Sequence, residues 1–395
     1  MSERTTDLIH HPYRPPAGFE APQPGVFRAS TVLFPNVAAM RQRDWRRRDG
    51  YTYGLHGTPT TFTLEERIAT LEGGQHCVLV PSGLSAIANV DMALLAAGDE
   101  VLIPDNAYGP SLALAEGELS RWGITHQRYD PMDPQDLRDR IGPRTRLVWL
   151  EAPGSVTMEF PPLAALAAAC RERGVVSALD NTWGAGLAFH GFEEGGADIV
   201  VQALTKYPSG GGDVLMGSIV TRDESLHLKI KLAHMRLGLG VSGNDAEAVL
   251  RALPSMELRY RAQDQSARQL AAWFQTQPQI ARVLHPALPG SPGHEHWRAL
   301  CGRSGLAAGL FSVVFQQEVP PERVDAFCDA LSLFRLGYSW GGPMSLVVPY
   351  SVPSMRSLDR ASWQAQGALV RFSVGLEAVA DLQADLAAAL ETVLG

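Results

Sequence analysis

Six short apolar segments, alternating with helical patterns and turns, constrain this chain most strongly. They lie at residues 77–80, 100–104, 145–151, 175–179, 199–204 and 217–221. Short runs rich in Val, Ile and Leu are typical of strands that are buried on both faces. Their alternation with helical stretches predicts an α/β fold, in which a mostly parallel sheet carries helices on both faces.

Two of these segments lead into residues of opposite charge. Asp180 follows the segment at 175–179, and Lys206 follows the segment at 199–204. Ligands of open α/β sheets bind beyond the carboxyl ends of the strands, so both side chains are expected to face one crevice. A carboxylate keeps a pyridine nitrogen protonated, and a lysine amine carries an aldehyde as a Schiff base. The pair indicates a pyridoxal 5′-phosphate site, although each residue alone is equally consistent with a turn cap or a surface lysine.

A turn of small residues, from Ser82 to Ser85, joins the first segment to a helical stretch. Backbone N–H groups at a helix N-terminus attract phosphate, and Gly83 lets the backbone approach it closely. Tyr108 follows the segment at 100–104 and is a candidate to stack on a planar ring, although a tyrosine in a turn more often only packs.

Charge and cysteine content bear on partners and compartment. The formal net charge of -8 speaks against nucleic acid. Five arginines are interrupted by Asp44, Trp45 and Asp49, which favours a solvated or subunit-contact face; they are Arg41, Arg43, Arg46, Arg47 and Arg48. Four cysteines without paired spacing indicate buried thiols in a reducing cytoplasm. We expect a cytoplasmic protein without a membrane span.

Ordered motifs run from about residue 51 to the C-terminus. They lie at residues 53–60 (YGLHGTPT), 71–74 (LEGG), 151–155 (EAPGS), 180–183 (DNTW), 205–207 (TKY), 285–290 (HPALPG), 338–342 (YSWGG) and 370–377 (VRFSVGLE). With these motifs the chain resembles the Cys/Met-metabolism enzymes that use pyridoxal phosphate, and most closely the bacterial cystathionine β-lyases. The resemblance implies a fold-type I, aspartate aminotransferase-like enzyme with a smaller C-terminal α/β domain.

The resemblance also implies a role for each matching residue. Lys206 would bind the cofactor aldehyde and act as the base, Asp180 would pair with the pyridinium, and Tyr108 would stack on the ring and serve in catalysis. Gly83, Leu84 and Thr205 would hold the phosphate.

The remaining implied roles concern the substrate and the assembly. Arg371 would clamp the substrate carboxylate as a bidentate fork, supported by Ser339 and Trp340. Tyr53 would contact the phosphate and the substrate in the site of a neighbouring subunit and would take part in the reaction there. We therefore expect a homo-oligomer, a tetramer built from two dimers. The expected units are an arm (1–60) that contributes to the neighbouring site, a cofactor domain (61–250) and a C-terminal domain (251–395).

Three positions depart from the family pattern. Leu55 stands where an arginine is typical, and Ala203 stands where many members carry a serine, so the phosphate loses a charge and a hydroxyl donor. His56 is a candidate to compensate. We expect looser cofactor binding than in the family. Met344 replaces a frequent glutamate near the substrate side chain, which leaves the substrate less defined than the cofactor.

The expected reaction is β-elimination of L-cystathionine to homocysteine, pyruvate and ammonia. The YSWGG form of residues 338–342 favours it over γ-class reactions, by analogy. Alternatives are cystathionine γ-synthase, O-acylhomoserine sulfhydrylase, methionine γ-lyase and cysteine desulfhydrase; a non-catalytic scaffold is a further one. No metal is expected, since His294, Glu295 and His296 lie in a Gly/Pro-rich stretch, expected to be a loop, and lack the helical spacing of a zinc site.

Overall fold

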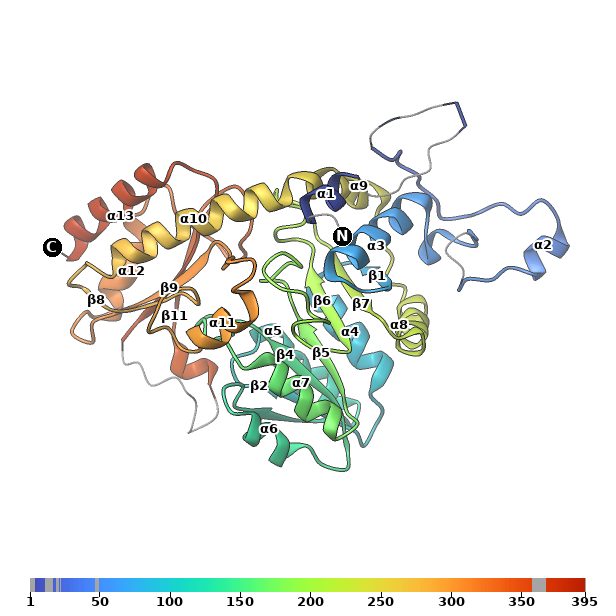
Figure 1. Cartoon of the computed structure of the whole chain (residues 1–395), viewed down its shortest axis with the longest axis horizontal. Helices are drawn as coiled ribbons and strands as arrows, with labels where there is room; N and C mark the ends of the chain where they lie inside the picture. The colour runs from blue at the N-terminus through green and yellow to red at the C-terminus, as the bar shows by residue number, and fades with distance from the viewer. Residues whose placement is uncertain are drawn as a thin grey trace.

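The computed structural model describes residues 4–10, 17–18, 21, 23–46, 50–356 and 367–394. Arg47 and Arg48 of the arginine cluster lie outside these residues. Within them, the chain forms two sheets, a larger one in the N-terminal part and a smaller one in the C-terminal part (Figure 1).

The larger sheet has seven strands among the described residues, in the order β1-β7-β6-β5-β4-β2-β3. Strands β2 to β6 run parallel, and β7 runs antiparallel to both of its neighbours, β1 and β6. Their bounds are β1 His76–Val80, β2 Glu100–Pro104, β3 Thr125–Tyr129, β4 Thr145–Glu151, β5 Val176–Asp180, β6 Ile199–Ala203 and β7 Gly217–Thr221. The expected mostly parallel sheet is therefore confirmed.

Helices cover both faces of this sheet because its strands carry apolar side chains on both faces. Cys77 and Leu79 of β1 join one core, whereas Val78 and Val80 join the other. The first core receives side chains from α3 (Pro59–Glu72), α7 (Leu163–Glu172) and α9 (Gly243–Ala252). The second receives them from α4 (Gly83–Leu94), α5 (Gly109–Leu114) and α8 (Glu224–Leu237). Helix α6 (Pro134–Arg140) contacts α7 and β3.

The smaller sheet has five strands in the described part of the chain, in the order β10-β11-β12-β9-β8. Only β10 and β11 pair in parallel among these strands, which are β8 Ile280–Leu284, β9 Leu310–Phe315, β10 Arg335–Leu336, β11 Leu346–Tyr350 and β12 Leu369–Ser373. One face packs against α10 (Met256–Phe274), α12 (Pro321–Ala330) and α13 (Val379–Leu394). Residues of the other face, such as Leu284 and Leu310, join the core of the larger sheet.

The stripe that the sequence predicts on α13 packs as expected. Leu382, Leu386 and Leu390 are buried, and Val379 and Val393 are partly buried against the same core. The sequence analysis did not predict strand β3. The expectation of a loop at His294 and His296 was wrong, because these residues begin helix α11 (His294–Cys301). No helix among the described residues combines the length and hydrophobicity that a bilayer span requires. The expected boundaries between the arm, the cofactor domain and the C-terminal domain, at residues 60 and 250, stay a prediction.

In the N-terminal arm, α1 (Arg4–Ile9) packs against α3, and the stretch that carries α2 (Val37–Arg41) extends away from the rest of the molecule (Figure 1). Its regular elements within the described residues are short: α1 Arg4–Ile9, α2 Val37–Arg41 and η1 Gly54–His56. Several of its large apolar side chains are exposed, among them Phe27 (43%), Leu33 (88%) and Val37 (55%). An exposed apolar arm of this kind is a feature of segments that contact another chain.

A buried carboxyl on α4 gives the fold a pH-dependent stability. Asp91 is 2% exposed and accepts a hydrogen bond of 2.9 Å from Trp149 Nε1. Burial raises the pKa of Asp91 to about 7, although the Trp149 bond acts in the opposite direction. The folded protein therefore holds this proton more tightly than the unfolded chain, so the free energy of unfolding falls as pH rises toward that value.

Replacement Asp91→Asn is expected to stabilise the protein at high pH. The amide oxygen still accepts from Trp149 but never ionises, so the gain in unfolding free energy should be about 2–3 kcal/mol larger at pH 8 than at pH 5. Urea unfolding at both pH values measures it. The replacement Trp149→Phe, which removes the donor without removing the charge, serves as control, and an equal effect of Asp91→Asn at both pH values would contradict the argument.

Candidate active site

Asp180 and Lys206 come together at the carboxyl edge of the larger sheet. Asp180 is the last residue of β5, and Lys206 lies in the turn that follows β6. The strands are neighbours, so their ends meet at one edge. The two side chains interact electrostatically: burial and then Arg371 lower the pKa of Lys206 to about 8, whereas Asp180 raises it. A lysine with this pKa has an appreciable neutral fraction near neutral pH, so it can act as a nucleophile or base.

Thr182 fixes the carboxyl group of Asp180. Its backbone N–H and its hydroxyl donate to Asp180 Oδ1 over 2.9 and 2.5 Å. The same hydroxyl accepts from the backbone N–H of Ala203 at 2.9 Å, which ties the end of β5 to the end of β6. Burial raises the pKa of Asp180, and the Thr182 bonds and Lys206 counteract this. The site therefore holds a half-buried, oriented carboxyl that a cation would keep ionised.

Residues of the C-terminal part complete the surroundings of Lys206. Its Nζ donates to Ser339 Oγ at 2.6 Å and lies 5.4 Å from the ring centroid of Trp340. Arg371 Nη2 donates to the backbone oxygen of Ser339 at 3.2 Å. Ser339 has φ 107°, a conformation that is strained for a residue with a side chain and is often found at functional sites. The structure thus brings Lys206, Ser339, Trp340 and Arg371 together, although they are far apart in the sequence.

Tyr108 lies at the same edge, directly before α5. Its backbone N–H donates to Glu151 Oε2 at 2.7 Å, and its side chain is 42% exposed. Burial, Asp180, Glu151 and Tyr350 all raise the pKa of its phenol, in that order. The phenol is therefore neutral at physiological pH and lies within range of Asp180, where an aromatic ring cation would be placed.

The turn before α4 has the backbone features of an anion site. Ser82 caps the helix, with its Oγ accepting from Ser85 N at 3.0 Å. A Cβ on Gly83 would lie only 2.7 Å from the Cβ of Ala203, so the close contact between α4 and β6 requires glycine. Thr205 Oγ1 lies 3.3 Å from both the backbone N and the backbone O of Met216. Gly83 and Leu84 supply the first N–H groups of α4, which lack partners within a helix.

Tyr53 lies on the N-terminal arm, immediately before η1. Its side chain is 44% exposed, and its hydroxyl is 3.4 Å from Ser30 Oγ of the same arm. Its role in a neighbouring subunit stays a prediction. Leu55 and His56 follow it, and the His56 ring is held by Thr52 Oγ1 at 2.8 Å.

Sequence reasoning missed Glu151, Thr182 and Tyr350 as members of this site. Glu151 ends β4 and is paired in register with Asp180. Its oxygens accept from Tyr108 N and, at 2.6 Å, from Ser155 Oγ. Burial and then Asp180 raise the pKa of Glu151 to about 8. Glu151 and Thr182 lie in motifs that carry the family resemblance, and their position at or just after a strand end was the sequence signal that could have identified them. The sequence carried no such signal for Tyr350.

The donor set fits pyridoxal phosphate. The aldehyde requires an amine, which the half-buried Lys206 supplies. The ring nitrogen requires a carboxyl, which Asp180 supplies with its orientation fixed by Thr182. The ring face requires a neutral aromatic group, which Tyr108 supplies. The phosphate requires N–H donors, which the N-terminus of α4 offers where this helix approaches β6 closely at Gly83.

Comparisons with known proteins agree with this geometry. The family model for Cys/Met metabolism PLP-dependent enzymes matches residues 5–391. A putative cystathionine beta-lyase of Rhizobium johnstonii is 40% identical over 92% of this chain and 89% of that protein. The cystathionine beta-lyase MetC of Escherichia coli is 37% identical over 93% of each. The crystal structure of metB from Corynebacterium glutamicum superposes with a TM-score of 0.89 and 26% identity, covering 99% of this chain and 98% of that one. The chain belongs to the Cys/Met-metabolism family of pyridoxal-phosphate-dependent enzymes.

Proposed function

We propose that this enzyme is a carbon-sulfur lyase that cleaves L-cystathionine by β-elimination to homocysteine, pyruvate and ammonia. The observation that carries the proposal is a half-buried lysine amine, Lys206, which donates to Ser339 and interacts electrostatically with both Asp180 and Arg371. The names of the relatives support the choice of substrate, because proteins 37% and 40% identical to this chain are named cystathionine beta-lyases.

The roles are those that the family resemblance implies. Lys206 would bind the cofactor aldehyde, Asp180 would hold the pyridine nitrogen in its protonated form, and Tyr108 would cover the ring. Gly83, Leu84 and Thr205 would hold the phosphate. The bound cofactor supplies an electron sink for the electron pair that the substrate Cα–H bond leaves behind.

The proton and the leaving group then follow from the chain's own side chains. Arg371 holds the substrate carboxylate, and Trp340 and Ser339 border that group. Lys206 Nζ takes the Cα proton, because its pKa of about 8 gives it a neutral fraction at the working pH. The Cβ–S bond breaks with its electron pair on sulfur, so the thiolate leaves as homocysteine. Water converts the three-carbon fragment to pyruvate and ammonia.

The shared site also belongs to this proposal. The exposed apolar side chains of the arm, Phe27, Leu33 and Val37 among them, support its contact with a second subunit. Tyr53 would then reach the phosphate of that subunit and take part in its reaction and substrate binding. A tetramer made of two such dimers, located in the cytoplasm, is the assembly we propose.

An absorbance spectrum before and after addition of L-cystathionine tests the reaction, with both oxo-acid products assayed in the same sample. We expect a visible cofactor band that changes on addition, together with pyruvate. Production of 2-oxobutyrate would move the protein to the γ-class reactions. Absence of any band after addition of pyridoxal phosphate would favour a non-catalytic scaffold.

Cofactor retention is expected to be weak, because the arm offers little charge to the phosphate. Leu55 replaces a typical arginine, and burial, Lys231 and Arg43 all lower the pKa of His56, which favours its neutral form. The replacement Leu55→Arg should bind the cofactor about tenfold more tightly, since a hydrogen bond to a charged group contributes about 1.5–3 kcal/mol. Cofactor absorbance after dialysis measures this. Leu237→Arg, at an exposed position on α8, is the control; full retention by the unchanged enzyme would contradict the expectation.

A further inference from the structure

Tyr350 lies where the candidate carboxylate group and the candidate ring-stacking group approach each other. It ends β11, and Val348, two residues earlier, is paired with Arg371 on β12. Side chains alternate along a strand, so Tyr350 shares the face of Val348 and is diagonal to Arg371. The guanidinium carbon of Arg371 lies 5.5 Å from the centroid of the Tyr350 ring, which is a cation–π contact. Tyr350 also lies within electrostatic range of Tyr108.

The guanidinium of Arg371 needs such a partner. Arg371 is 8% exposed, and its Nη2 donates to Ser339 O. Its Nε is buried without a hydrogen-bond partner among the described residues. The planar guanidinium recognises a carboxylate with two parallel hydrogen bonds only when its plane is fixed. A neighbouring group that fixes this plane and leaves a guanidinium nitrogen unpaired therefore prepares Arg371 to bind the carboxylate.

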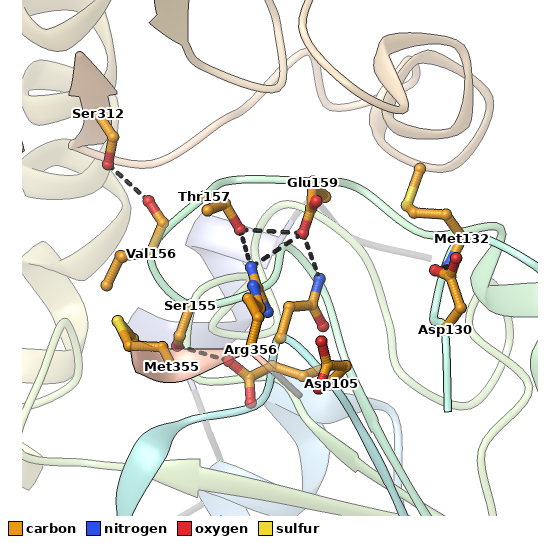
Figure 2. A network of polar contacts seen from close by, with 12 residues as sticks. Asp105, Asp130, Met132, Ser155, Val156, Thr157, Glu159, Ser312, Met355 and Arg356 are labelled. Atoms are coloured by element: carbon orange, nitrogen blue, oxygen red, sulfur yellow. Dashed lines mark hydrogen bonds and ion pairs between the residues drawn. The ribbon is translucent and has the colours of Figure 1, made fainter. Parts of the chain in front are cut away.

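A buried ion pair anchors the segment that follows Tyr350. Arg356 lies directly after η4 (Val352–Met355), and its Nη2 is 3.2 Å from Glu159 Oε2 and hydrogen-bonded to Thr157 Oγ1 (Figure 2). Both charged side chains are at most 9% exposed. Removing one partner of a buried pair leaves the other charge uncompensated, so the contact strongly favours one position of the segment.

The same network reaches the loop that carries Tyr108. Glu159 Oε2 accepts from Asn106 Nδ2 at 2.9 Å, and Asn106 is two residues before Tyr108. Arg128 Nη1 donates to Met355 O at 3.2 Å and pairs with Asp105 Oδ1 at 3.4 Å. The segment after β11 and the Tyr108 loop are therefore held together at two points.

We propose that Tyr350 is a positioning residue of the amino-acid carboxylate site, which orients Arg371 against Tyr108 and is itself held in place by the Arg356–Glu159 ion pair. This inference rests on the proposed function for one assignment only, that the carboxylate of an amino acid binds Arg371. It extends the site to a residue outside the motifs that the family resemblance used.

Binding of L-alanine and of ethylamine to the cofactor-loaded enzyme tests the inference. Each is followed by its change in visible absorbance. L-alanine carries the carboxylate but no leaving group on Cβ, and ethylamine lacks the carboxylate. We expect Tyr350→Leu, which removes the ring, to weaken binding of L-alanine about tenfold, the effect of losing one largely desolvated cation–π contact, and binding of ethylamine by less than about twofold. Because neither ligand is cleaved, failure of the lyase proposal would not alter this result.

Tyr350→Phe provides the matched control, because it keeps the aromatic ring that faces Arg371. It should bind both ligands as the unchanged enzyme does. Equal weakening of L-alanine and ethylamine by Tyr350→Leu, or no weakening of either, would overturn the inference.

Arg356→Met tests the anchor separately. Alone it should weaken L-alanine selectively, as Tyr350→Leu does. In combination with Tyr350→Leu it should add less than about twofold, because the proposed anchor acts only through the position of the Tyr350 ring. Fully additive losses would show that Arg356 does not act through Tyr350.

Discussion

Replacement of Lys206 by alanine is expected to lower kcat for L-cystathionine cleavage at least about a thousandfold, with the fold intact. A positioned general base contributes about 10²–10⁴ in rate, and the same amine is the proposed attachment point of the cofactor. The side chain donates to Ser339 Oγ and lies near Asp180 and Arg371, so no neighbouring amine is placed to replace it among the described contacts. Pyruvate release and the visible cofactor band together measure the effect.

The control for Lys206→Ala is Lys229→Ala. Lys229 is an exposed lysine on α8, and its removal should change kcat by less than about twofold. Ethylamine added to the Lys206→Ala enzyme should restore part of the rate, because a small primary amine can enter the space that the side chain leaves. A variant that keeps more than about a tenth of the activity would refute the assignment of Lys206.

The strands that the sequence predicted correctly are those buried on both faces. Strands β2, β4 and β7 have the predicted bounds, because continuous apolar runs are distinctive and strong turn signals flank them. Strand β3 (THQRY) was missed because it lies at the sheet edge, where four of its five residues are exposed or half-buried and polar. A strand that buries little carries no hydrophobic pattern from which it can be recognised.

The cofactor half of the candidate site was predictable because each of its residues follows a recognisable strand. Asp180 and Lys206 end neighbouring parallel strands, so local pattern and the sheet rule sufficed. The substrate half was not predictable in this way. Ser339 and Lys206 are 133 residues apart, and Arg371 reaches them only through the antiparallel pairing of the smaller sheet. Arg371 and Ser339 therefore came from family resemblance, and Tyr350 came from the structure alone.

Glu151 shows the same limit at closer range. Its partner in register is Asp180, which requires β4 and β5 to be neighbours. The order of strands in a sheet is a tertiary property, so the sequence indicated a polar strand end but not the paired carboxyls. Burial first, and then this pairing with Asp180, raise the pKa of Glu151 to about 8, and its Oε2 accepts from the backbone N–H of Tyr108.

Asp180→Asn is expected to reduce kcat by about a hundred- to a thousandfold, the cost of removing one oriented group that stabilises charge in a transition state. The amide oxygen can still accept from the N–H and hydroxyl of Thr182, so the variant keeps the link between β5 and β6 and loses mainly the charge. It should also lower the pKa of Lys206 further, because Asp180 raises that pKa in the unchanged enzyme.

Asp198→Asn is the matched control for this second prediction. Asp198 lies at the opposite end of the same strand pair, where its Oδ2 accepts from Ser177 N and Ser177 Oγ at 2.9 Å, so it makes the same kind of local contact far from Lys206. Single-turnover pyruvate formation should fall for Asp180→Asn and stay within about twofold for Asp198→Asn. Cofactor absorbance should persist in both, which separates a lost charge from a lost cofactor. Near-normal turnover of Asp180→Asn with bound cofactor would mean that a carboxylate at the end of β5 is not needed for the ring to accept electrons.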